Sequence, residues 1–102
     1  MSRDRDALAL EAAYAAVLAL DLRYRRTVLS SPSDARKLRR KRDEAFDAFQ
    51  GARVRLLEAG ILSGEADLVE LAAVREAIEK ARKIEAAVAG AIRLVGVLRR
   101  FL

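Results

Sequence analysis

The C-terminal segment, residues 84–102, constrains the fold of this chain more than any other stretch. It reads IEAAVAGAIRLVGVLRRFL, and its only charged residues are Glu85, Arg93, Arg99 and Arg100. The remaining side chains are aliphatic, small or aromatic, so another surface has to cover much of the segment. Which surface covers it decides whether the chain folds alone or assembles with a partner.

The composition narrows the classes of protein and of chemistry. The chain has 102 residues, which predicts a single domain spanning 1–102. Of these residues 21 are Ala, so the core is thin and oligomerisation is a natural source of added stability. Cys and His are both absent, so we expect no disulfide, no metal and no cofactor. Asn is absent and Gln occurs once, which suits a thermophilic protein, although GC-rich coding bias gives a similar composition.

Three helices and no strand are predicted, because Ala, Leu, Arg and Glu dominate while Gly and Pro are rare. The first helix covers residues 4–29. From Ala7 to Leu20 its only charged residue is Glu11, so it is apolar on nearly every face. Such a helix is usually buried on several sides, and the alternative is a segment that inserts into lipid.

The second helix is predicted at 32–59, directly after the first. Ser31 is a good N-cap residue and Pro32 suits the first helical position. The connection is therefore very short, and the two helices should form an antiparallel hairpin. Gly60 is expected to end the second helix, and Ser63 to cap the third.

The third helix is predicted at 64–101 and is the longest. Its apolar residues recur mostly at alternating three- and four-residue steps, with one irregularity between Ala81 and Ile84. Gly90 and Gly96 lower helix propensity, so a kink or an early end at either remains open. The predicted fold is all-α, an antiparallel three-helix bundle made of a helical hairpin and a longer C-terminal helix.

The predicted helix lengths do not match. At 1.5 Å per residue the first two helices are roughly 40 Å long and the third about 55–60 Å. If the third packs antiparallel to the second, everything beyond about Ile92 overhangs. We therefore expect oligomerisation through the C-terminal helix, with another copy of the chain or a related helical chain. The predicted interface is Val88, Ala91, Ile92, Leu94, Val95, Val97, Leu98, Phe101 and Leu102. A break at Gly90 that folds the tail back, or insertion into lipid, are the alternatives.

Basic residues gather where the predicted hairpin turns. Nine of them and one acid, Asp34, lie between positions 23 and 42, a local charge of +8 in a chain of net charge +5. A focused cluster of this kind is the footprint expected for phosphate binding, which for double-stranded nucleic acid is largely independent of sequence. The candidate nucleic-acid-binding residues are Arg23, Arg25, Arg26, Arg36, Lys37, Arg39, Arg40, Lys41 and Arg42.

Other interpretations of this cluster remain open. A solvated helix with internal ion pairs, such as Arg39 with Asp43 or Arg40 with Glu44, accounts for part of it. An anionic membrane or an acidic protein are further possible partners, and both are weaker alternatives than nucleic acid. An enzyme is not expected, because the chain has no E-x-x-H motif, no Gly-rich phosphate loop and no nucleophile–base pair.

Location and role follow from these features. No signal peptide and no uncharged run of transmembrane length is visible, so an intracellular or virion location is expected. A nucleoprotein or virion coat, or a chromatin-like structural protein, would combine a basic surface with self-assembly. In general style the chain resembles small, basic, all-helical coat proteins of filamentous viruses, a resemblance of composition and architecture that implies no particular residue. A helical adaptor or scaffold that binds another protein is the alternative.

Overall fold

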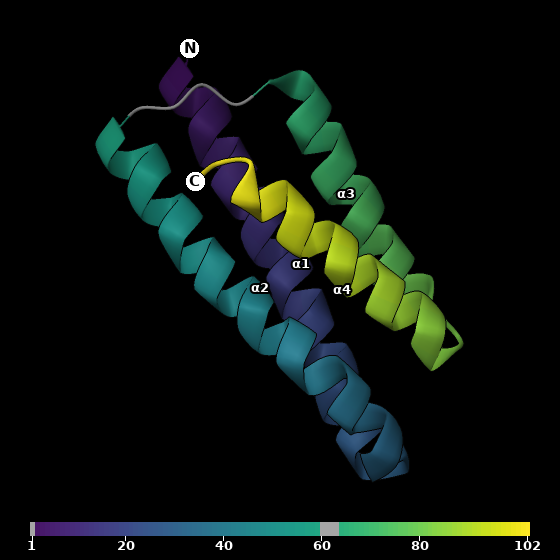
Figure 1. The fold of residues 1–102 in the computed structure, drawn as a ribbon. Coiled ribbons are helices and arrows are strands. Elements are labelled where there is room, and N and C mark those ends of the chain that lie inside the picture. The colour runs from purple at the N-terminus through teal and green to yellow at the C-terminus, as the bar shows by residue number, and fades with distance from the viewer. Residues whose placement is uncertain (1, 60–63) are drawn as a thin grey trace.

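A computed structural model of the protein describes residues 2–59 and 64–102, with side chains described for 5–58 and from 64 onward. Four α-helices make up nearly all of these residues, and no strand occurs among them, which confirms the all-α class. They are α1 (Ser2–Ser30), α2 (Pro32–Ala59), α3 (Glu65–Lys80) and α4 (Ile84–Arg99) (Figure 1). The expected cap residues Gly60 and Ser63 lie outside the described residues.

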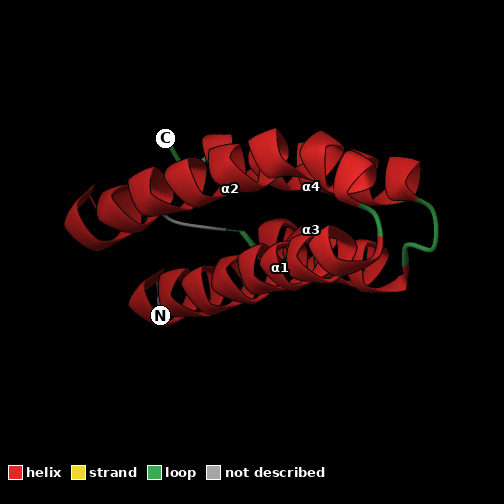
Figure 2. Ribbon diagram, turned by 90° about the horizontal axis from the view of Figure 1, so that it is seen from below, coloured by secondary structure: helices red, strands yellow, loops and turns green. Residues whose placement is uncertain are grey.

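Two helical hairpins pack into two layers. The α1–α2 hairpin is antiparallel, and α3 and α4 form a second antiparallel hairpin (Figure 1). Figure 2 shows α1 and α3 in one layer and α2 and α4 in the other. The strongest contacts between hairpins join α1 to α3 and α2 to α4, and both pairs run parallel. The connections α1–α2 and α3–α4 therefore lie at the same end of the bundle, which positions the candidate site.

Ser31 separates α1 from α2, as the sequence predicted. It is the single non-helical residue between them, and its backbone accepts a hydrogen bond from Ala35 N at 3.0 Å. Its own N–H donates to Thr27 O at 2.7 Å, so it also closes the last turn of α1. Pro32 has no N–H to satisfy and therefore costs nothing at the first position of α2. The helices predicted at 4–29 and 32–59 correspond to α1 and α2.

The expected single helix at 64–101 is replaced by two helices, because the chain reverses at residues 81–83. Ala81 and Lys83 both have extended backbones, with ψ of 118° and 148°. Neither Gly nor Pro is present there, so no local breaker causes the reversal. It falls on the irregular step between Ala81 and Ile84, where the apolar face changes direction. The alternative of a break at Gly90 or Gly96 does not occur, since both glycines lie inside α4.

The reversal buries the C-terminal apolar residues inside the chain itself. Leu94 and Leu98 are fully buried, and Phe101 is 3% exposed. Burial of such a side chain stabilises the fold by about 1.5–3 kcal/mol, which outweighs the lost helical hydrogen bonds at the break. The described C-terminal segment, residues 84–102, does not overhang the bundle, so the geometric reason for a C-terminal oligomer interface was wrong. The predicted interface residues that lie in the core or are partly buried against it are Val88, Ala91, Leu94, Val95, Val97, Leu98 and Phe101, and only Ile92 and Leu102 are exposed.

Gly90 is a point of close contact between α4 and α3. A Cβ placed on Gly90 would lie 2.8 Å from Cγ1 of Ile78, a side chain that is fully buried. Gly96 lies on the exposed side of the same helix, and a Cβ there would meet nothing within 4 Å. The two glycines share one helix and differ only in what surrounds them, so they test the α3–α4 packing directly.

We predict opposite effects for alanine at these two positions. Gly96→Ala should raise the free energy of unfolding by about 0.5–1 kcal/mol, because Ala loses less backbone entropy in a helix. Gly90→Ala should lower it by roughly 1 kcal/mol or more, because the new methyl group overpacks against Ile78. Urea denaturation followed by circular dichroism measures both. Equal stabilisation by the two substitutions would mean that α4 does not pack on α3 as described.

Candidate functional site

The nine predicted cations all lie at the end of the bundle that carries both connections, α1–α2 and α3–α4 (Figure 2). We call this surface, from residue 23 to 42 together with residues 82 and 83, the basic end. The α3–α4 reversal brings Arg82 and Lys83 to this end, and both are exposed. Sequence reasoning missed these two residues because it counted charges along one hairpin only. The irregular apolar step beside them was the available signal.

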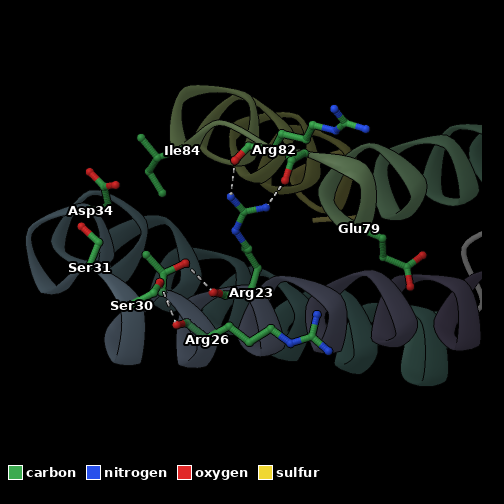
Figure 3. Close-up of a pocket in the computed structure, with 10 residues that line it drawn as sticks. Arg23, Arg26, Ser30, Ser31, Asp34, Glu79, Arg82 and Ile84 are labelled. Carbon is green, nitrogen blue, oxygen red and sulfur yellow. Dashed lines mark hydrogen bonds between the residues drawn. The ribbon is translucent and has the colours of Figure 1, made fainter.

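Arg23 holds the two hairpins together. Its guanidinium donates hydrogen bonds to Ala81 O and, at 3.2 Å, to Arg82 O, both in the α3–α4 connection (Figure 3). Because the chain reverses here, these two carbonyls have no hydrogen-bond donor from a following helical turn. An Arg on α1 supplies the missing donors. Arg23 is only half-buried, but its donors are directed inward. Its role is structural, although its positive charge still contributes to the local field.

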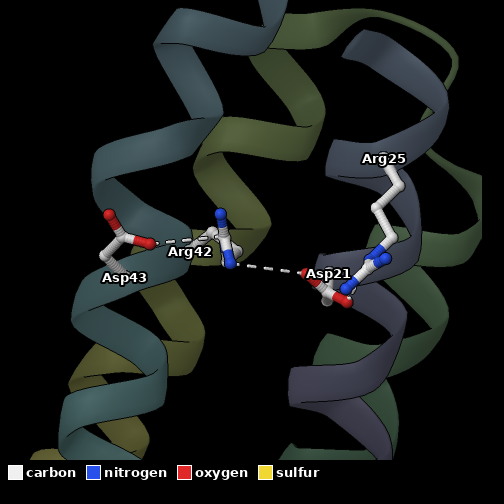
Figure 4. Close-up of polar contacts among 4 residues, drawn as sticks. All are labelled: Asp21, Arg25, Arg42 and Asp43. Atoms are coloured by element: carbon white, nitrogen blue, oxygen red, sulfur yellow. Dashed lines mark hydrogen bonds and ion pairs between the residues drawn. The ribbon is translucent and has the colours of Figure 1, made fainter. Parts of the chain in front are cut away.

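Arg42 is also held within the protein. Its guanidinium lies 4.5 Å from the centre of the Tyr24 ring, and Nη1 is 3.6 Å from Asp21 Oδ1 across the hairpin. Its Nε is 3.3 Å from Asp43 Oδ1, an ion-pair contact without hydrogen-bond geometry. Figure 4 shows Asp21 between Arg42 and Arg25, and it accepts a 2.8 Å hydrogen bond from Arg25 Nε. One carboxylate on α1 thus neutralises part of two predicted cations.

Three more predicted cations have acidic neighbours on their own helix. Lys37 Nζ is 3.6 Å from Asp34. Lys41 donates to Glu44 at 3.1 Å, and Arg40 Nε lies 3.9 Å from the same carboxylate. These are exposed or half-exposed pairs of the i, i+3 or i, i+4 type, each of which adds a few tenths of a kcal/mol at most. They remain able to exchange partners. Their charge is balanced only in part, because Asp34 and Glu44 face three cations and Arg99 also lies 3.9 Å from Glu44.

Five cations of the basic end have no ion-pair partner among the described residues. They come from three segments: one from α1, two from α2 and two from the α3–α4 connection. All five side chains are exposed. They are Arg26, Arg36, Arg39, Arg82 and Lys83.

A groove of about 460 Å³ lies between the two connections. Its walls include Arg26 and Arg82, but also the carboxylates Asp34 and Glu79 (Figure 3). Two acids in one groove disfavour an enclosed anion pocket, since each repels a bound phosphate. The positive charge that remains available therefore lies on the outer surface of the basic end, where the unpaired cations are exposed.

Carboxylates elsewhere in the second hairpin serve local ion pairs. Lys80 donates a hydrogen bond to Glu76 at 2.5 Å, and that bond lowers the pKa of Glu76 below its ordinary value. Arg100, at the end of α4, binds Glu70 at 2.8 Å and lies 3.6 Å from Asp67, both on α3. Among the described residues no group of three or more acidic side chains could hold a metal ion. Within the same residues, no helix has both the length and the hydropathy needed to cross a lipid bilayer.

Comparisons with protein-family models, with curated proteins and with solved structures find no match to this chain.

We predict that the neighbouring arginines Arg23 and Arg26 differ sharply in their effect on stability. Arg23→Ala should lower the free energy of unfolding by about 1–2 kcal/mol, because two backbone carbonyls lose a charged donor. Arg26→Ala should change it by less than about 0.5 kcal/mol, as expected for an exposed side chain without a partner. Urea denaturation of the two variants measures the difference. If Arg23→Ala is as stable as Arg26→Ala, Arg23 does not join the hairpins.

Proposed function

We propose that this protein is a non-catalytic structural protein whose basic end binds the phosphate backbone of double-stranded nucleic acid without reading its sequence. The observation that carries the proposal is a set of five exposed cations that have no carboxylate partner in the described part of the chain. They come from three segments at one end of the bundle and are Arg26, Arg36, Arg39, Arg82 and Lys83. Four of the five are Arg, which stays charged at any physiological pH and can bind a phosphate through two parallel hydrogen bonds.

Sequence-independent binding is supported by what this surface lacks. The chain has no Asn, and its one Gln, Gln50, lies eleven positions from Arg39, roughly 16 Å along α2. Tyr24 is the aromatic residue of the cluster, and Arg42 covers its ring at 4.5 Å, so it is not free to stack on a base. Phosphate contacts made by arginine and lysine position a protein on a duplex but carry no base information.

The binding should depend steeply on salt. If all five cations contact phosphates, the slope of log K against log salt is about −4.5, a loss of affinity of about 10²- to 10³-fold between 50 and 200 mM salt. Fluorescence anisotropy with a labelled duplex of arbitrary sequence measures this slope. A second duplex of unrelated sequence should bind with the same affinity within about threefold.

We predict that Arg36→Glu combined with Arg39→Glu abolishes most of this binding and flattens the salt slope by about 2. The matched control is Arg53→Glu combined with Arg55→Glu, which makes the same charge change on two exposed residues in the other half of α2. Under the proposal the control keeps most of its affinity. Equal losses in the two variants would show a general charge effect, and no binding of the unaltered chain at 50 mM salt would remove the proposal.

A helical scaffold that binds other proteins is the second candidate function, and it is favoured by four exposed leucines of α1, which are Leu8, Leu18, Leu22 and Leu29. We do not propose that copies interlock through their C-terminal helices, because the apolar residues of that segment are buried within the chain. A chain that binds no duplex but still self-associates would favour the scaffold over the nucleic-acid protein.

A further inference from the structure

The outer side of α1 carries an uncovered apolar stripe. Its seven residues follow one another at alternating steps of three and four, the spacing of a coiled-coil seam. They lie opposite the buried line of α1, which includes Ala9, Ala13, Ala16 and Leu20. The stripe, called the α1 stripe below, is Leu8, Glu11, Ala15, Leu18, Leu22, Arg25 and Leu29.

Its four leucines are strongly exposed: Leu8 by 53%, Leu18 by 44%, Leu22 by 49% and Leu29 by 88%. The contacts of α1 are made with α2, α3 and, more weakly, α4, all on its other sides. The sequence predicted burial of α1 on several sides, and within the described chain its outer side is not buried. Exposed leucines that recur along one helix seam are typical of an interaction site.

The charges on the stripe indicate which partner can cover it, a second copy of this chain. Glu11 and Arg25 each lie seven positions from Leu18, on opposite sides of it. When two copies of α1 pack antiparallel with a twofold axis beside Leu18, Glu11 of each copy meets Arg25 of the other. When they pack parallel, Glu11 meets Glu11 and Arg25 meets Arg25, which is repulsive. The stripe is therefore self-complementary only in the antiparallel arrangement, as a twofold interface requires.

Size complementarity follows the same symmetry. Ala15 and Leu22 lie three and four positions from Leu18, so a small residue of one copy faces a large residue of the other. Leu8 and Leu29 lie ten and eleven positions from Leu18, so Leu8 of one copy faces Leu29 of the other. Arg25 is available for a second partner, because its pair with Asp21 uses Nε and its side chain remains 73% exposed.

We propose that the α1 stripe is the interface of an antiparallel homodimer, in which two copies of this chain cover each other's exposed leucines. The stripe spans about 32 Å but is one helix wide, so its area is at the low end of specific interfaces and self-association should be on the order of micromolar. The proposal does not depend on nucleic-acid binding, since Arg36 and Arg39 lie outside the stripe.

Sedimentation equilibrium of the full chain from about 1 to 500 μM tests the dimer. We expect a monomer–dimer equilibrium that Leu18→Glu abolishes, because the substitution puts two carboxylates at the twofold axis. Glu11→Arg and Arg25→Glu should each weaken dimerisation by tenfold or more, since each places like charges together. The double variant Glu11→Arg with Arg25→Glu should recover most of the affinity. Recovery by the double variant is the decisive result, because non-specific association of leucines would not show it.

Disulfide trapping gives an independent test, since the chain contains no Cys. Leu18→Cys should oxidise rapidly to a covalent dimer, because the two positions meet at the axis. The matched control is Ile92→Cys on α4, where Ile92 is 52% exposed and lies outside the stripe. The proposal is overturned if the chain stays monomeric at 500 μM, if both cysteines cross-link equally, or if neutral lipid vesicles rather than a second copy bind the leucines. The variant Arg36→Glu with Arg39→Glu should still dimerise, which separates this outcome from that of the proposed function.

Discussion

The reversal of the chain at residues 81–83 is the constraint on which the rest of the structure depends. It brings α4 back onto α2 and gives the apolar residues of the C-terminal segment a surface inside their own chain. Leu94 and Leu98 become fully buried as a result. The reversal also leaves two backbone carbonyls, Ala81 O and Arg82 O, without hydrogen-bond donors from their own helix. The Arg23 guanidinium, on the other hairpin, donates hydrogen bonds to both. Burial and hydrogen bonding thus stabilise a break that no Gly or Pro imposes locally.

Much of this architecture could be predicted from the sequence, because local chemistry encodes it. Ser31 and Pro32 encode the α1–α2 boundary, and the composition encodes the all-α class. The reversal was missed because only an irregular step between Ala81 and Ile84 signals it, while helix propensity on both sides is high. Its cause is tertiary: a straight helix would leave Leu94 and Leu98 in water, and a bent one buries them.

The basic end was partly predictable for a similar reason. Counting charges along the sequence found the cluster, because residues just before and just after the turn of an antiparallel hairpin lie close together. It could not distinguish paired from unpaired cations, because partners such as Asp21 and Arg42 are 21 positions apart and meet only across the hairpin. It also could not find Arg82 and Lys83, which reach this end only because the chain reverses there.

The basic end and the α1 stripe share Arg25 and Leu29 but differ in physical character. The basic end presents five exposed cations without ion-pair partners among the described residues, and salt would weaken the attraction to phosphate that we propose for them. The α1 stripe is mainly apolar with two symmetrically placed charges, and in the proposed dimer burial of its leucines would supply most of the driving force. A protein with both surfaces can assemble in pairs and bind a polyanion at the same time, which is the combination expected of a structural protein that coats or compacts a nucleic acid.

The distance between α3 and the end of α4 tests the reversal most directly. Val69 and Arg99 are both exposed, and the chain has no Cys of its own. Cysteines introduced at these two positions can carry spin labels, and pulsed electron paramagnetic resonance measures the distance between the labels. The two positions are thirty residues apart, so a continuous helix would separate them by about 45 Å, whereas the hairpin holds them below about 25 Å, label arms included. We predict the short distance, unchanged when labelled chains are diluted with unlabelled ones. A distance near 45 Å, or a short one lost on dilution, would contradict the reversal within a single chain.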